Sequence, residues 1–154
     1  MWRVLESVSC SDSRLISFTI SGQPIPLKRH RSTRQGRMYD PSFKDKKDMW
    51  LQIARFKPKK PLESPVYLRL AFYLKRPKYH FKTKKGKPTK IVKDRFLDIK
   101  YHSSKPDIDN LVKMIADVVQ GKNRMIVDDS QICMLQAEKF YGKPRTEVII
   151  QEVS

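Results

Sequence analysis

A cluster of carboxylates in a strongly basic chain is the feature that most constrains this sequence. The 154 residues carry 33 Lys and Arg against 16 Asp and Glu, a formal net charge of +17. Five of the 16 acids nevertheless fall within residues 105–129. These acids are Asp107, Asp109, Asp117, Asp128 and Asp129. A divalent cation requires such a concentration of negative charge, and the basic remainder suits a polyanion such as nucleic acid.

An amphipathic helix is predicted to run through this cluster. Apolar residues recur with the i, i+3, i+4, i+7 and i+10 spacing of one helix face. They are Ile108, Leu111, Val112, Ile115 and Val118. Pro106 suits the approach to a helix, and Gly121 is expected to end it. At about 100° per residue, Asp109, Lys113 and Asp117 should project together from the opposite face.

These residue types are those of a site for Mg²⁺, with Mn²⁺ as a possible substitute, because both ions prefer hard oxygen ligands. The candidate ligands are Asp107, Asp109, Asp128 and Asp129. Lys113 is one turn beyond Asp109 and could stabilise charge at a scissile phosphate. Each residue also has an ordinary explanation: helix capping for Asp107 or Asp109, an i,i+4 ion pair for Asp109 with Lys113, and a turn for Asp128-Asp129. Their clustering in so basic a chain favours the metal site.

Residues 105–113, KPDIDNLVK, together with Asp117 and residues 128–132, DDSQI, resemble the signature of the RusA-like Holliday junction resolvases. The likeness extends more loosely to residues 22–26 and to the closing strand pair, so it covers most of residues 15–153. It implies a homodimer that binds four-way DNA junctions and cuts two strands symmetrically with Mg²⁺. Proteins of this kind act in DNA recombination and repair and are common in phages and prophages.

The resemblance also implies roles for individual residues. It makes Asp107, Asp109 and Asp129 the catalytic acids and Lys113 the essential lysine. The connection 121–127 looks longer than the usual link to the acidic pair. Asp128 therefore stays beside Asp129 as a candidate metal ligand.

Two basic segments are candidate DNA-binding surfaces. Residues 28–37 hold five cations and no acid, and residues 75–95 hold ten Lys and Arg with a single acid in a long basic loop or hairpin. The candidate DNA contacts are Lys28, Arg29, Arg31, Arg34, Arg37, Lys82, Lys84, Lys85, Lys87 and Lys105. Tyr79 and Phe81 are expected either to stack on bases at a branch point or to pin the segment to the domain. The three histidines show no ligand pattern and are interpreted as part of the basic surface or as incidental.

The remaining pattern predicts one α+β domain at residues 15–154, after a flexible extension at residues 1–14. It contains a mixed sheet of about four strands, with two main helices on one face. The expected strands are 16–20, 66–74, 132–141 and 146–153, and the expected helices are 42–56 and 108–120. No stretch approaches the ~18 apolar residues of a membrane span, so no membrane partner is expected. The absence of a secretory signal and two cysteines that read as free thiols, Cys10 and Cys133, predict a cytoplasmic location.

A competing hypothesis is a non-catalytic, basic nucleic-acid-binding protein whose acids are only structural caps and turn residues. The net charge fits this hypothesis equally well, because phosphate neutralisation dominates binding in both cases. The clustered acids count against it, since carboxylates beside a cationic surface repel the nucleic acid that the surface attracts.

Overall fold

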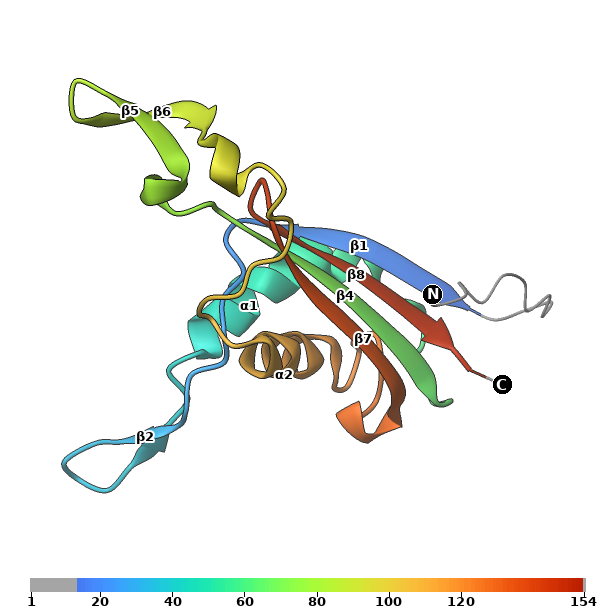
Figure 1. The fold of residues 1–154 in the computed structure, drawn as a ribbon. Coiled ribbons are helices and arrows are strands. Elements are labelled where there is room, and N and C mark those ends of the chain that lie inside the picture. Colours follow the sequence, from blue (N-terminus) through green and yellow to red (C-terminus); the bar gives the residue numbers. More distant parts are fainter. Residues whose placement is uncertain (1–13, 154) are drawn as a thin grey trace.

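A mixed four-stranded sheet is the centre of the fold, as the sequence predicts (Figure 1). The computed structural model describes residues 14–153. In it β1 (Leu15–Ser21), β4 (Val66–Leu74), β7 (Ile132–Tyr141) and β8 (Arg145–Glu152) lie in the order β1-β8-β4-β7. β4 runs parallel to β7, whereas β8 is antiparallel to both β1 and β4. The predicted α+β class is confirmed.

Two helices, α1 (Phe43–Ile53) and α2 (Ile108–Val119), cover one face of this sheet. The alternation along β4 explains why only one face is covered. Its buried side chains are Val66, Leu68, Leu70, Phe72 and Leu74. They pack in one core cluster with Met49 and Ile53 of α1 and with the apolar side chains of α2. The residues between them in β4 are intermediate or exposed and lie on the open face.

The buried face of α2 differs in part from the predicted stripe. Its buried residues are Leu111, Met114, Ile115, Ala116, Val118 and Val119. Ile108, predicted to be buried, is 37% exposed, and Val112 is intermediate. α2 contacts both the sheet and α1, so the buried part of its surface is wider than the predicted apolar stripe. The buried part also extends toward Met114 and Val119.

The segment expected as a long basic loop or hairpin is a hairpin that projects from the domain (Figure 1). It comprises β5 (Phe81–Lys84) and β6 (Lys87–Val92), between the short 3₁₀ turns Lys78–His80 and Asp94–Phe96. Lys85 and Gly86 join the strands with φ of 51° and 74°, the positive values of a two-residue hairpin turn. We call residues 81–92 the β5–β6 arm.

A second hairpin stands where the sequence predicts only a basic loop. Its strands are β2 (Arg31–Ser32) and β3 (Met38–Tyr39), and we call residues 31–39 the β2–β3 arm. Figure 1 shows both arms on the same side of the domain, with the first turn of α2 between their bases. Two short strands escape sequence analysis because no apolar alternation marks them.

β7 is an edge strand, and half of its outer edge is open. Residues 100–102 cover the other half, since the N–H groups of Tyr141 and His102 donate to the carbonyls of Lys100 and Lys139. Cys133 is an extra residue at a register shift, so the alternation of side chains along β7 is interrupted there. Residues 133–136 are all exposed.

Some expectations concern residues that the structure does not describe. The predicted extension at residues 1–14, except Arg14, lies outside the described residues, as does Cys10. Cys133 is an exposed free thiol. Among the helices of residues 14–153, none has the length and apolar character needed to cross a membrane.

Lys46 of α1 binds two carboxylates, Asp117 of α2 and Asp40 of the segment before α1. Its Nζ lies 2.6 Å from Asp40 and 2.8 Å from Asp117, and all three side chains are largely buried. The hydrogen bond from Lys46 lowers the pKa of Asp40. Burial alone would lower the pKa of Lys46, but the hydrogen bonds to Asp117 and Asp40 outweigh burial and raise it. Asp117 therefore has a structural role, since its carboxylate binds Lys46, whereas Lys113 binds Asp109.

We predict that Lys46→Ala lowers the free energy of unfolding by about 1–3 kcal/mol, because it leaves two half-buried carboxylates without their cation. Lys47→Ala is the matched control, since Lys47 is exposed and has no ion pair within the described residues. Because the folded state depresses the pKa of Asp40, its contribution is present above the ordinary aspartate range near pH 4 and is lost as pH falls through the folded pKa. Urea unfolding at neutral and acidic pH would measure both effects, and equal losses in the two variants would contradict the prediction.

Candidate functional site

The first turn of α2 is held in place from two sides. Nζ of Lys139, in β7, donates to the carbonyls of Ser104 and Pro106, both at 2.7 Å. The N–H of Leu27 donates to the carbonyl of Asn110 at 2.9 Å. These bonds connect the helix start to the sheet and to the chain that leads into the β2–β3 arm. The sequence analysis missed Lys139, because a lone lysine in a strand carries no signal for a loop 33 residues away.

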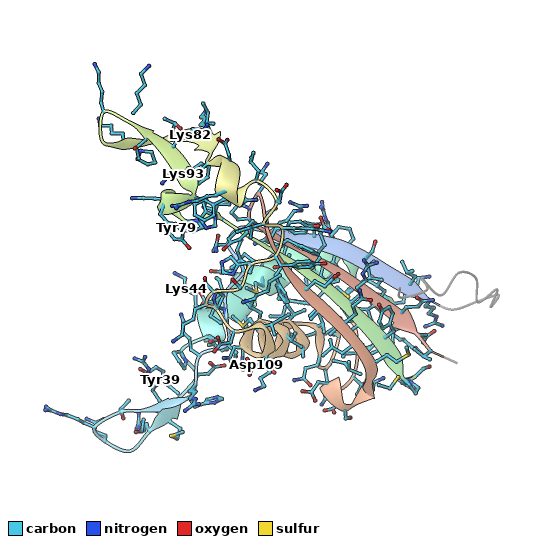
Figure 2. All side chains as sticks on the ribbon, viewed as in Figure 1. Tyr39, Lys44, Tyr79, Lys82, Lys93 and Asp109 are labelled. Carbon is cyan, nitrogen blue, oxygen red and sulfur yellow. The ribbon has the colours of Figure 1, made fainter. Side chains whose placement is uncertain are left out.

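Asp107 and Asp109 present their carboxylates to solvent at this helix start. Asp107 occupies the N-cap position with extended backbone, but its side chain makes no capping hydrogen bond. Asp109 lies 3.3 Å from Lys113, and the two side chains are 60% and 62% exposed. Figure 2 shows Asp109 near the base of the β2–β3 arm, on the side of the domain from which both arms project. The i,i+4 ion pair is therefore present, whereas helix capping does not account for either acid.

Asp128 caps the short 3₁₀ turn Asp129–Gln131 that precedes β7. Its carboxylate accepts a hydrogen bond from the N–H of Ser130 at 3.0 Å and belongs to a capping box with Gln131. Hydrogen bonds from the Ser130 hydroxyl and backbone lower the pKa of Asp128. The N–H of Asp129 donates to Oε1 of Gln120, but its carboxylate has no hydrogen bond or ion pair within residues 14–153. Asp129 thus has the freer carboxylate of the pair.

Gln131 fixes this acidic turn with four hydrogen bonds. Its Oε1 accepts from the N–H groups of Val127 and Asp128, and its Nε2 donates to the carbonyls of Leu62 and Ser64, all at 2.9 Å. The Asp-x-x-Gln spacing is a capping-box signal, so sequence reasoning had the means to recognise this role. The contacts with Leu62 and Ser64 depend on tertiary structure alone.

The two groups of acids lie at opposite ends of α2. Asp129 contacts Gln120, just beyond the end of the helix. Asp109 and Gln120 are separated by roughly 16 Å along the axis, at about 1.5 Å per residue. Within the described residues no three His, Cys, Asp or Glu side chains are close enough together to hold a metal ion. One chain therefore brings Asp109 to Lys113 and near Asp107, but does not bring Asp129 to them.

Most of the predicted DNA contacts are exposed cations on the two arms. Lys28 and Lys82 differ, because Lys28 lies 3.0 Å from Asp45 and Lys82 lies 3.3 Å from Asp94. The others are exposed and have no ion pair within residues 14–153. They are Arg29, Arg31, Arg34, Arg37, Lys84, Lys85, Lys87 and Lys105. Each arm thus carries cations that are free to contact phosphates.

An aromatic cluster anchors the base of the β5–β6 arm. The His80 ring stacks on Phe96 with centroids 4.0 Å apart, and Tyr79 meets both rings edge-on. The guanidinium of Arg76 donates to the carbonyls of Phe96 and Ile99. Tyr79 therefore helps to anchor the arm while remaining 58% exposed.

Two of the histidines are buried, which corrects their interpretation as surface or incidental residues. His80 is 3% exposed and His102 is 9% exposed. Burial, reinforced by nearby cations, lowers the pKa of both. Both rings lie against Tyr141, with centroids 5.2 and 4.8 Å away. They are packing residues of the arm base and do not approach the acids as metal ligands.

The sequence model of the family described as "Endodeoxyribonuclease RusA" matches residues 21–151. The protein described as "Uncharacterized protein YqaN" from Bacillus subtilis (strain 168) is 35% identical over 146 residues, which cover 90% of this chain and 97% of that protein. The family match spans the α2 acids, the acidic turn and both arms.

We predict that Gln131→Ala lowers the free energy of unfolding by about 1–3 kcal/mol, because it leaves backbone groups of the acidic turn without partners. Hydrogen exchange at the amides of Val127 and Asp128 should accelerate more than at amides in the middle of α2. Gln23→Ala, which removes an exposed glutamine side chain just after β1, is the control. Unchanged exchange at both amides would show that Gln131 does not hold the turn.

Proposed function

Because this chain belongs to the RusA endodeoxyribonuclease family, we propose that it is a Mg²⁺-dependent endonuclease that resolves four-way (Holliday) DNA junctions by paired, symmetric phosphodiester cleavage. The observation that carries the proposal is the position of Asp107 and Asp109, which present exposed carboxylates at the first turn of α2, on the side of the domain from which two arms rich in unpaired cations project. Such an enzyme would act in DNA recombination and repair, in a phage, prophage or host, and its proposed location is the cytoplasm.

The donor set fits a hard divalent cation. The carboxylate of Asp107 makes no hydrogen bond within the described residues, and that of Asp109 accepts only from Lys113, so both retain free oxygens. Mg²⁺, or Mn²⁺ in its place, would polarise the phosphoryl group and lower the pKa of a bound water. Lys113, whose charge Asp109 balances in the free protein, would then face the scissile phosphate and stabilise charge there.

Two copies of the chain would complete the site. One chain carries Asp107 and Asp109 at the start of α2 and Asp129 beyond its end. A two-fold axis through the open half of β7 would pair this edge strand antiparallel with its copy. The start of each β7, next to Asp129, would then lie toward the end of the other β7, where Lys139 holds the segment before α2. Paired cleavage also requires two equivalent sites, which a two-fold dimer provides.

The exposed surface of β7 supports this assembly. Met134 and Leu135 are 50% and 53% exposed on an edge strand whose backbone is open at residues 133–136. Natural proteins usually cover, charge or shorten such an edge, because it can pair with another chain. Pairing with a second copy would cover both the apolar side chains and the free backbone groups.

The proposal predicts complementation between two inactive variants. Asp109→Asn and Asp129→Asn should each lower Mg²⁺-dependent cutting of a synthetic four-way junction at least about a hundredfold, because each removes a metal ligand. Binding should persist, since a repulsive charge is lost. Heterodimers of the two variants would contain one complete site and one doubly altered site. They should therefore nick one strand without the symmetric second cut.

The controls separate the parts of this proposal. Asp48→Asn removes an exposed acid from α1 and should leave cutting unchanged. If the heterodimers are as inactive as either variant alone, the shared site is refuted. If the wild-type protein with Mg²⁺ cuts no DNA at all, the nuclease proposal fails and the non-catalytic binding protein remains.

A separate prediction concerns the β5–β6 arm. Replacing Lys84, Lys85 and Lys87 with Gln should weaken junction binding and reduce the slope of log affinity against log salt by about one per lost phosphate contact. Replacing Lys59 and Lys60, two exposed lysines between α1 and β4, is the control. An unchanged slope in the arm variant would show that this arm faces away from DNA.

A further inference from the structure

Three large apolar side chains are exposed within six residues, on the β2–β3 arm and at the start of α1. Met38 and Tyr39 on the β2–β3 arm are 68% and 45% exposed, and Phe43 at the start of α1 is 70% exposed. None of them belongs to the core cluster or to the partly buried residues packed against it. We call Met38, Tyr39 and Phe43 the apolar patch. Met38 and Tyr39 are consecutive in β3, so their side chains leave opposite faces of the arm. Three such side chains exposed along one short stretch of a protein of charge +17 indicate a binding segment that presents apolar groups on both faces.

The apolar patch is held close to the first turn of α2. At the base of the arm, the N–H of Leu27 donates to Asn110 of α2, and the N–H of Lys28 donates to the Ser42 hydroxyl. Ser42 is fully buried, and Lys28 also pairs with Asp45 of α1. Asn110 directly follows Asp109. The base of the β2–β3 arm is therefore anchored to the first turn of α2, and Figure 2 shows Tyr39 and Asp109 on the same side of the domain.

The surroundings of the patch determine what can occupy it. Arg31 is the cross-strand neighbour of Tyr39, and Arg34, Arg37, Lys44 and Lys47 are exposed nearby in the sequence. A second copy of the same surface would be repelled by these cations. These cations attract a nucleic acid, but the apolar side chains of Met38, Tyr39 and Phe43 do not bind its phosphates. Apolar and aromatic side chains gain by packing on base faces, which continuous duplex hides and a branch point can expose.

We propose that the apolar patch packs against unstacked base pairs at the branch point and makes the protein prefer a junction to duplex DNA. The inference rests on the proposed function, since it names how that site selects its substrate. In this arrangement the cations of the arm bind phosphates without regard to structure. Met38, Tyr39 and Phe43 supply the contact that only a branched DNA offers.

The test compares binding to a four-way junction and to a duplex of the same arm sequence, in EDTA so that no cutting occurs. Replacing all three patch residues with Ala should weaken junction binding about tenfold or more, because base stacking is lost. Duplex affinity should stay within about twofold, since the cations are unchanged. A 2-aminopurine placed at the branch should brighten when the wild-type protein binds and should brighten less with the variant.

Matched variants make the result specific. Leu15→Ala removes an apolar side chain of similar exposure, 58%, from the start of β1 and should behave as wild type. Tyr39→Phe keeps the ring and should retain junction preference, whereas Tyr39→Ala should lose part of it. These single changes lie on the surface and serve if the triple variant does not fold.

Several outcomes would overturn the inference. Equal loss of junction and duplex affinity would assign the patch to general backbone binding, and unchanged junction preference would leave it without a role in selection. A triple variant that sediments as a smaller species than wild type would make the patch a contact between copies. If the wild-type protein itself shows no preference for a junction, the proposed function fails. If the wild-type protein prefers a junction and the variants retain that preference, only the role of the patch is refuted.

Discussion

The packing of α2 on the sheet is the interaction on which the rest of the structure depends. Leu111, Ile115 and Val118 bury one side of the helix in the core beneath the sheet, which leaves Asp109 and Lys113 on the exposed side. The same burial sets the axis of the helix, so its start lies between the arms and its end meets the acidic turn. The side to which Asp109 and Lys113 project therefore follows from the packing of this one helix.

Electrostatics divides the acids of this basic chain into two kinds. Asp40, Asp45 and Asp117 are paired with lysines and join elements of the fold. Asp107 and Asp129 have no such partner within the described residues, although cations are abundant in the chain. Leaving a carboxylate unpaired in a protein of this charge forgoes available stabilisation. Unpaired carboxylates of this kind are suited to bind a metal ion, which would supply the positive charge that a lysine supplies to the other acids.

Several parts of the site were beyond sequence reasoning for identifiable physical reasons. Lys139 and Gln131 act through hydrogen bonds to chain segments 33 and more than 60 residues away, and such contacts leave no local pattern. The open edge of β7 depends on strand order, which the alternation of side chains does not encode. His80 and His102 are buried by the arm base and so cannot be judged from composition. The β2–β3 arm is too short for a periodic signal.

The sequence by itself determined the α+β class, the existence of α2, the position of the acids along the chain and the basic character of both arms. Hydrophobic periodicity and charge are local properties, and they can be read without knowing the fold. Only the tertiary structure decided which acids meet. Asp117 binds Lys46, Asp128 caps a turn, and Asp129 lies a helix length from Asp109. Packing alone brings residues that are distant in the sequence into contact. A helix is rigid, so residues on one face of α2 stay aligned while residues at its two ends stay apart.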